Sequence, residues 1–202
     1  MSNRSDMTFP RLAVFLSGGG RTLLNIDDQI KAGELQAQIP LVVASRACAG
    51  ADRAAARGLH TVILPRVFGE PELLTLLNAH QIDLVVLAGF LRLMPVPEAF
   101  EGRIINIHPS LLPRHGGPGM YGHFVHEAVL KSGDTESGCT VHLCTQEYDK
   151  GRILVQRRCP VKPDDTPQTL ADRVFEQELL AMPEAIKLRL AELQLGPTPI
   201  AH

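Results

Sequence analysis

Residues 103–109 read RIINIHP. Side chains alternate between the two faces of a strand, so Asn106 and His108 share one face while Ile105 and Ile107 share the other. Pro109 ends the strand because proline has no N–H group to donate to a β-ladder. Open α/β sheets place their ligand crevice at the carboxyl ends of parallel strands. The stretch therefore predicts a strand that carries an amide and an imidazole into a binding site.

These two side chains suit a reaction in which negative charge develops on an oxygen atom. The amide of Asn106 can donate a hydrogen bond to that oxygen, and the imidazole of His108 can move a proton near neutral pH. A structural role at a sheet edge is the alternative for His108, and capping of the following turn is the alternative for Asn106. Their position on one face of the strand favours catalysis.

Working outward, apolar strand-like runs alternate with helical patterns through the first half of the chain. Strands are expected at residues 12–17, 39–45, 60–64, 84–88 and 103–108, and helices at 21–32, 50–57 and 70–80. This alternation predicts an α/β fold with a doubly wound, mostly parallel sheet. The run at 84–88 consists of apolar residues, as expected for a strand that is buried on both faces.

The pattern changes after His108. A loop rich in Gly and Pro covers residues 109–122, and a helix is expected at 123–131. Strands at 139–144 and 153–161 are joined by so short a turn that they predict an antiparallel hairpin. A long final helix is expected to begin near Thr166-Pro167 and to end near Leu193. The whole chain, residues 1–202, is predicted to be one domain with an ordered core of about 11–193 and flexible tails.

Composition limits the possible partners and cofactors. The 202 residues are 45% hydrophobic and carry a formal net charge of -2, without the basic excess of a nucleic-acid-binding protein. No apolar run reaches membrane-spanning length, and the polar N-terminus is unlike a signal peptide. The four cysteines contain no C-x-x-C pair, so neither a zinc site nor a disulfide framework is predicted. The sequence thus predicts a cytoplasmic protein with small-molecule substrates, as a monomer or homodimer, with no nucleic acid, membrane or metal partner.

A glycine-rich turn, residues 17–22 (SGGGRT), follows the first expected strand and opens the first helix. Backbone N–H groups at a helix N-terminus, accessible where side chains are small, bind anions, whereas the alternative is merely a tight turn. Leu23 stands where a dinucleotide fingerprint needs a small residue, and no Gly-Lys-Ser/Thr follows as in a Walker motif. A single phosphomonoester on a small substrate fits this turn best.

Several segments also resemble a known family. They are residues 17–23 (SGGGRTL), 87–94 (LAGFLRLM), 105–113 (INIHPSLLP) and 138–142 (GCTVH), with Asp149 after them. In this order they are similar to the folate-dependent formyltransferases that act on phosphoribosylglycinamide. The similarity extends over about residues 11 to 190, and its N-x-H-P-S-L-L-P block is highly specific to enzymes that transfer formyl groups from folate.

The resemblance implies a Rossmann-like formyltransferase fold. It also implies an activity, the transfer of a formyl group from the co-substrate 10-formyltetrahydrofolate to the amine of 5-phosphoribosylglycinamide in purine biosynthesis. By similarity, catalysis is assigned to Asn106, His108 and Asp149. The substrate phosphate is assigned to Gly20, Arg21 and Thr22, and the substrate ribose to Glu178. Residues assigned to the folate are Leu91, Arg92, Leu93, Met94, Asn106 and Thr140.

Several of these residues also have ordinary structural interpretations. An aspartate is a common turn residue, and Asp149 lies in the turn-like run Tyr148-Asp149-Lys150-Gly151, so only the resemblance favours a catalytic role for it. Glu178 could lie on a solvated helix face, and Leu91, Leu93 and Met94 could belong to the core. His142 shares a strand face with Thr140, which favours a core position or a supporting position beside the site. His115, His123 and His126 are interpreted as loop or surface histidines.

A carboxylate near His108 is expected to raise the pKa of the imidazole and so favour the protonated, proton-donating form. Asp149 is the candidate. Three other functions remain open. Formyltetrahydrofolate deformylase, a hydrolase, passes the formyl group to water, methionyl-tRNA formyltransferase is expected to need an RNA-binding domain, and a nucleotide-binding module would need no catalytic residues. The deformylase shares Asn106, His108 and Asp149, so these residues argue only against the binding module.

Overall fold

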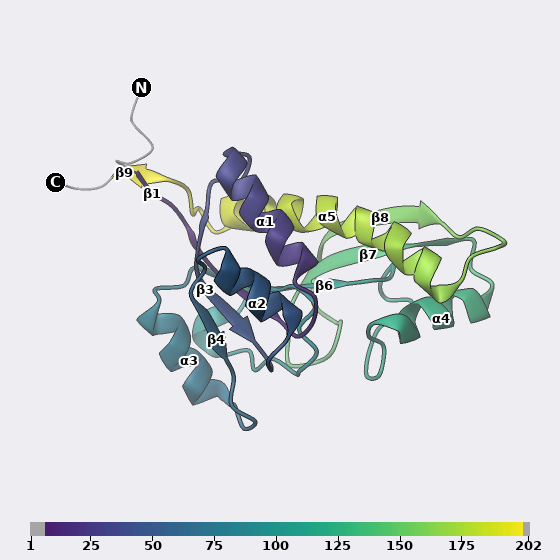
Figure 1. Cartoon of the computed structure of the whole chain (residues 1–202), viewed down its shortest axis with the longest axis horizontal. Helices are drawn as coiled ribbons and strands as arrows, with labels where there is room; N and C mark the ends of the chain where they lie inside the picture. The colour runs from purple at the N-terminus through teal and green to yellow at the C-terminus, as the bar shows by residue number, and fades with distance from the viewer. Residues whose placement is uncertain (1–6, 200–202) are drawn as a thin grey trace. The chain divides into compact units, whose positions relative to one another are not determined.

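The computed structural model describes residues 7–199 (Figure 1). The chain divides into two compact units, one formed by residues 1–90 with 186–202 and the other by residues 91–185. A single domain over the whole chain remains a prediction. The expected flexibility of residues 1–6 and 200–202 lies outside the described residues.

The first unit contains a parallel set of strands. These are β2 (Arg11–Leu16), β3 (Gln38–Ala44), β4 (Thr61–Ile63) and β5 (Leu84–Leu87). They lie in the order β4-β3-β2-β5, with every pair parallel. All four residues of β5 are buried, which explains why that strand is uniformly apolar. The predicted alternation of strands and helices is confirmed here, with boundaries within one or two residues.

Three helices connect these strands: α1 (Arg21–Ala32), α2 (Ala49–Ala56) and α3 (Glu70–Ala79). Helix α1 ends at Gly33, whose φ of 79° is the left-handed conformation that closes many helices. Helix α3 starts after Gly69, whose backbone N–H donates to the carboxylate of Glu72 at 3.0 Å. Local sequence chemistry thus sets these helix ends.

The second unit contains the strands that follow the first half. Strands β6 (Ile104–His108), β7 (Glu136–Leu143) and β8 (Ile153–Pro160) are antiparallel neighbours in that order, and helix α4 (His123–Ser132) precedes β7. Strand β7 begins three residues earlier than predicted. The reason is Gly138, where a Cβ atom would lie 2.0 Å from the carbonyl oxygen of Arg157, so only glycine allows the strand to pair there. The predicted antiparallel hairpin is confirmed.

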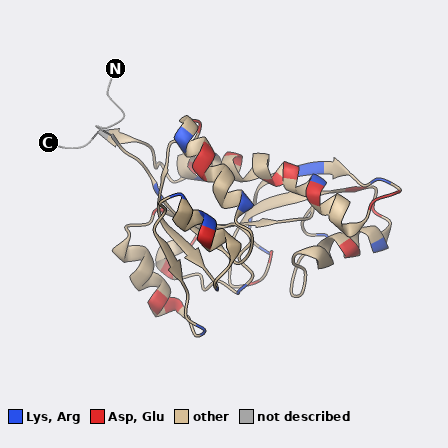
Figure 2. Cartoon of the chain, viewed as in Figure 1, with Lys and Arg blue, Asp and Glu red and all other residues tan. Residues whose placement is uncertain are grey.

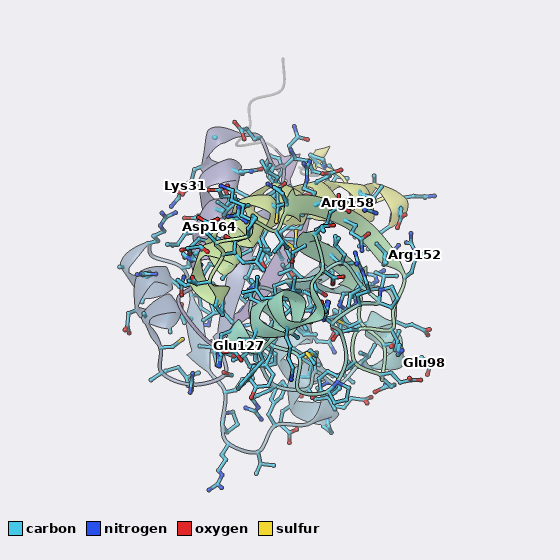
Figure 3. All side chains as sticks on the ribbon, turned by 90° about the vertical axis from the view of Figure 1, so that its right-hand side faces the viewer. Lys31, Glu98, Glu127, Arg152, Arg158 and Asp164 are labelled. Atoms are coloured by element: carbon cyan, nitrogen blue, oxygen red, sulfur yellow. The ribbon has the colours of Figure 1, made fainter. Side chains whose placement is uncertain are left out.

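The long final helix α5 (Pro167–Glu192) is also confirmed, with Pro183 inside it. Its start is capped by Thr166, whose hydroxyl accepts from the backbone N–H of Thr169 at 3.2 Å. The neighbouring Asp165 has a buried carboxylate that accepts two hydrogen bonds from the guanidinium of Arg173, at 2.6 and 2.7 Å. This bidentate pair holds the pKa of Asp165 well below its usual range. Acidic and basic residues are interspersed along α5 (Figure 2). Charged side chains such as Glu127 on α4 and Arg158 on β8 are exposed (Figure 3).

The described parts of the two tails contain regular structure, contrary to the prediction. Strand β1 (Met7–Thr8) pairs with β9 (Thr198–Pro199) in antiparallel fashion, and the hydroxyl of Thr8 donates to the carbonyl of Thr198 at 3.1 Å. Such a pairing joins residues far apart in the sequence, so no local pattern indicates it. Within residues 7–199, no helix is both long and apolar enough to cross a membrane.

Candidate active site

The candidate site lies in the second unit, where four side chains from three segments meet. Strand β6 supplies Asn106 and His108, strand β7 supplies His142, and the turn after β7 supplies Asp149. Strands β6 and β7 run side by side, with Asn106 opposite His142 and His108 opposite Thr140 (Figure 1). The period of the two strands therefore directs these side chains to one face.

Asn106 is half-buried and contacts His142. The Nδ1 atom of His142 lies 2.9 Å from the carbonyl oxygen of Leu143, and since a carbonyl only accepts, Nδ1 carries the hydrogen. In the neutral ring Nε2 is then an acceptor, and Nδ2 of Asn106 donates to it at 3.2 Å. An amide nitrogen carries two hydrogens, so Asn106 retains one N–H for a ligand.

His108 is held on both sides of its ring, and its side chain is 5% exposed. Its Nε2 atom lies 2.8 Å from the carbonyl oxygen of His115, so Nε2 is the protonated nitrogen. Its Nδ1 atom faces Oδ2 of Asp149 at 3.6 Å, which is an ion-pair distance rather than a direct hydrogen bond. The neutral ring therefore presents the Nδ1 lone pair toward the carboxylate.

Asp149 links both histidines to the loop after β6. Its Oδ1 atom lies 3.4 Å from Nε2 of His142, and its Oδ2 atom accepts a hydrogen bond from the backbone N–H of Gly117 at 2.8 Å. Asp149 has a φ of 55°, a left-handed conformation that is uncommon outside glycine. Unusual backbone conformations of this kind are concentrated at functional sites.

The electrostatics of the site differ from the sequence prediction in one respect. Burial lowers the pKa of His108, and the carboxylate of Asp149 and the hydrogen bond to His115 offset only part of that effect. The carboxylate of Asp149 therefore raises the pKa of His108 as predicted, but burial outweighs it, so the net pKa is lowered. Burial raises the pKa of Asp149, but the contact with His142, the charge of His108 and the N–H of Gly117 together hold it below its usual value.

The hydroxyl of Thr140, a residue predicted to contact folate, is bonded within the protein. Its side chain is fully buried, and its hydroxyl donates to the carbonyl of Ser110 at 2.7 Å. The same oxygen accepts from the N–H of Leu112 at 3.1 Å and from the amide of Gln156 at 3.0 Å. The hydroxyl thus has no capacity left for a ligand, and the structure indicates that Thr140 supports the loop after β6.

The segment predicted to contact folate offers apolar surface. Leu91 and Leu93 are 53% and 55% exposed, whereas Met94 is buried and Arg92 is half-buried. This segment is tied to the loop that carries Asp149, because the amide of Gln146 donates to the carbonyl of Val96 at 2.9 Å. Exposed apolar side chains of this kind can line a small-molecule site.

The glycine-rich turn lies in the first unit. Gly20 precedes the first residue of α1 with a φ of 73°, Arg21 is exposed, and Thr22 is buried. A Cβ atom on Gly20 would lie 2.8 Å from the Cα atom of Gly50, which follows the first residue of α2. The predicted helix start is confirmed. The turn also has a second contact from Arg53, whose guanidinium donates to the carbonyl of Gly19 at 2.7 Å.

The remaining predicted residues are placed as follows. Glu178 is half-buried on α5. His123 is exposed, whereas His126 is 5% exposed, so its interpretation as a surface or loop residue is wrong: it faces the packed side of α4 together with Val125 and Val129. No group of three or more His, Cys, Asp or Glu side chains within residues 7–199 is arranged to hold a metal ion.

Sequence reasoning missed two groups at the site, the carbonyl of His115 and the N–H of Gly117. Both are backbone groups, so residue identity gave no direct signal. The glycines of the loop gave an indirect one, because a Cβ atom on Gly116 would lie 2.5 Å from Leu112 Cδ2 and 3.4 Å from Asp149 Cβ. The small size of Gly116 therefore suits the close approach of this loop to the side chain of Asp149.

Comparison with known proteins now adds to this geometry. A family model described as "Formyl transferase" matches residues 10–186. The chain is 43% identical over 178 residues to a protein of Arabidopsis thaliana named "Phosphoribosylglycinamide formyltransferase, chloroplastic", covering 83% of this chain and 61% of that protein. The chain thus spans about three fifths of the length of this curated relative.

Solved structures show the same fold. A glycinamide ribonucleotide transformylase 1 from Symbiobacterium toebii matches with a TM-score of 0.84 and 34% identity, covering 91% of this chain and 89% of that one. A formyltetrahydrofolate deformylase from Pseudomonas syringae matches with a TM-score of 0.82 but 22% identity, covering 92% of this chain and 62% of that one, so it shows the fold alone. The fold is a mixed, mostly parallel seven-stranded α/β fold with a C-terminal antiparallel hairpin and a long final helix.

Proposed function

This chain belongs to the formyl transferase family, and we propose that it transfers the formyl group of 10-formyltetrahydrofolate to the amine of 5-phosphoribosylglycinamide in purine biosynthesis. The observation that carries the proposal is the meeting of Asn106, His108 and Asp149 in one network of the second unit. The 34% identity to the Symbiobacterium toebii transformylase over most of both chains supports the choice of substrate.

In the proposed reaction, the substrate amine attacks the formyl carbon, and a carbon–nitrogen bond forms as the carbonyl oxygen gains negative charge. The N–H of Asn106 that His142 does not use donates to this oxygen. One donor of this kind contributes on the order of a hundredfold or more to turnover. His108 in its protonated form supplies the proton that neutralises the oxygen.

Asp149 has two proposed roles. Its negative charge stabilises the protonated form of His108 against the effect of burial, and it accepts, through a water molecule, the proton that leaves the attacking amine. The carboxylate remains ionised near neutral pH because its pKa is held below the usual value. When the bond from the formyl carbon to the folate nitrogen breaks, the proton taken up at Asp149 passes to that nitrogen, and the oxygen returns its proton to His108 as the carbonyl re-forms. No net proton is then gained or lost by the protein.

The binding assignments follow the sequence resemblance. We propose that Gly20, Arg21 and Thr22 hold the substrate phosphate and that Glu178 contacts the ribose. The exposed Leu91 and Leu93, with Arg92 and Met94, are proposed to line the folate site. Thr140 is also proposed to line the folate site, but not through its hydroxyl, which is already saturated.

A formyltetrahydrofolate deformylase is the rival function, because the same catalytic groups can pass the formyl group to water. One assay distinguishes the two. Purified protein is mixed with 10-formyltetrahydrofolate, with and without phosphoribosylglycinamide, and loss of the formyl group is followed. We expect turnover only when the amine is present. Turnover without the amine would identify a hydrolase, and no turnover in either case would favour a binding protein without catalysis.

The location and assembly of the protein remain predictions. We propose a cytoplasmic enzyme, a monomer or homodimer, that acts on small molecules and has no nucleic-acid, membrane or metal partner. The relative from Arabidopsis thaliana is chloroplastic by name, so location differs within the family. Sedimentation of the purified protein would decide its assembly.

A further inference from the structure

Beyond the site itself, we infer that Asp134 is a positioning residue that, through His115, holds the neutral imidazole of His108 in the tautomer whose unprotonated Nδ1 faces Asp149. Asp134 lies in the turn between α4 and β7, and nothing in the sequence motif points to it. The inference rests on the proposed function, since it assigns a role in the same reaction. It is carried by a hydrogen-bonded network within the second unit that links Asp134 to His108 through His115.

This network begins at the carboxylate of Asp134. Its Oδ2 atom lies 2.7 Å from Nε2 of His115, and its Oδ1 atom accepts from the guanidinium of Arg114 at 3.1 Å. The hydrogen bond from His115 lowers the pKa of Asp134, as does the charge of Arg114, so this carboxylate is ionised at neutral pH. An ionised carboxylate only accepts, and Nε2 of His115 is therefore the donor.

The next part of this network is the backbone of His115. Its φ of 53° is a left-handed conformation that is uncommon outside glycine, and the contacts of His115 stabilise it. Asp134 and Arg114 provide this restraint on the side-chain side. The hydroxyl of Ser110 supports the same turn by donating to the carbonyl of Arg114 at 2.6 Å.

This network ends at the imidazole ring of His108. The carbonyl of His115 accepts from Nε2 of His108 at 2.8 Å, which fixes the tautomer and leaves Nδ1 facing Asp149. If the turn at His115 relaxes, Nε2 loses its acceptor and the neutral ring can exchange tautomers. Asp134 thus determines which nitrogen of His108 is protonated without touching the reacting atoms.

The principal test compares Asp134→Ala with Glu136→Ala. Glu136 lies two residues further on, in an exposed ion pair with Arg158. Its removal therefore makes the same change of net charge without altering the network from Asp134 to His108. In Asp134→Ala we expect kcat to fall roughly tenfold with little change in KM. Imidazole nitrogen NMR is expected to show the His108 ring shift from one tautomer to a mixture. Glu136→Ala is expected to match the wild type in both measurements.

A double-mutant cycle tests the route through His115. Asparagine tolerates the left-handed conformation, so His115→Asn removes the imidazole without adding backbone strain. We expect His115→Asn and Asp134→Ala to have similar effects and the double variant to be no worse than either. Fully additive losses, or an unchanged His108 spectrum in Asp134→Ala, would overturn the inference. The NMR measurement needs no turnover, so failure of the proposed reaction is detected separately, as absent amine-dependent activity in the wild type.

Discussion

The charge balance at His108 depends on a single carboxylate. Burial lowers the pKa of His108, and the charge of Asp149 is the principal effect that opposes it. When that charge is lost, no carboxylate among the groups that set this pKa opposes the effect of burial. The pKa of His108 then falls further, and the protonated, proton-donating ring becomes rarer at neutral pH. Asp149 thus affects the protonation of His108 as well as the proton transfer from the attacking amine.

Asp149→Asn is therefore expected to lower kcat by about a hundredfold or more and to lower the pKa of His108, because amide and carboxylate are similar in shape but differ in charge. Activity assays against pH and NMR titration of the His108 ring measure the two effects. Asp164→Asn, an exposed position shown in Figure 3, is the control for a change of net charge. Unchanged turnover and an unchanged His108 titration would show that the role assigned to Asp149 is incorrect.

At the level of residues, the sequence identified the side chains of the network but not its backbone partners. Asn106 and His108 were predictable because strand alternation places them together. Asp149 required the family resemblance, since an Asp in a turn is common. The carbonyl of His115 and the N–H of Gly117 could not be predicted, because backbone groups carry no residue-specific signal. The role of Thr140 depends on burial, which the sequence around it does not reveal.

Helix α4 carries a buried histidine that the proposed reaction does not use. His126 is 5% exposed, and its Nδ1 atom has no hydrogen-bond partner among the described residues. Burial lowers its pKa to about 4, and the nearby charges of His108 and His123 act in the same direction while Asp172 opposes them. The folded protein thus favours the neutral ring.

The sign of the resulting pH effect follows from linkage. Between pH 6.5 and about 4 the unfolded chain binds a proton at His126 that the folded chain does not, so stability falls as pH falls through this window. The loss is on the order of 3 kcal/mol at most. Urea denaturation from pH 7 to 4 is expected to show a shallower decline for His126→Gln than for the wild type. His108 contributes with the same sign, so some decline remains in the variant, and equal slopes would contradict the prediction.

The starts of α1 and α2 approach each other at two glycines. A Cβ atom on Gly50 would lie 2.6 Å from the carbonyl oxygen of Gly18 and 3.0 Å from the N atom of Gly20. Both are backbone atoms, which cannot rotate away as a side chain can. The backbone of Gly50 also donates to that carbonyl at 2.9 Å, so the contact fixes the shape of the glycine-rich turn.

Gly50→Ala is consequently expected to destabilise the fold by about 1–3 kcal/mol, the usual cost of overpacking. Gly18→Ala is the matched control, because a Cβ atom there would meet nothing within 4 Å. Thermal unfolding followed by circular dichroism compares the two variants. Equal melting temperatures would mean that the two helix starts separate at little cost.

Local patterns predicted most elements, and the exceptions have physical causes. Uniform apolar runs identified β5 and the other parallel strands, while the short turn before β8 identified the hairpin. The pairing of β1 with β9 joins opposite ends of the sequence, so no local run could indicate it. The early start of β7 depends on a close approach to β8 that only glycine permits, which is a tertiary constraint.

Across the whole molecule, the four cysteines are free thiols in differing surroundings. Cys139 and Cys159 are buried, and burial raises the pKa of both, that of Cys139 to about 12. Burial also raises the pKa of Cys144 to about 12, although part of that residue is accessible. A thiolate is the reactive form, so these three are expected to be inert near neutral pH.

Cys48, half-buried beside the first residue of α2, is the remaining thiol. A thiolate-selective reagent at pH 8 is therefore expected to modify one thiol of the native protein quickly and the other three only as the protein unfolds, because unfolding removes the burial that keeps them protonated. Cys48→Ser should abolish the fast phase and leave the slow phase intact. A fast phase that persists in this variant would mean that one of the other three thiols reacts in the folded protein, which would contradict the prediction.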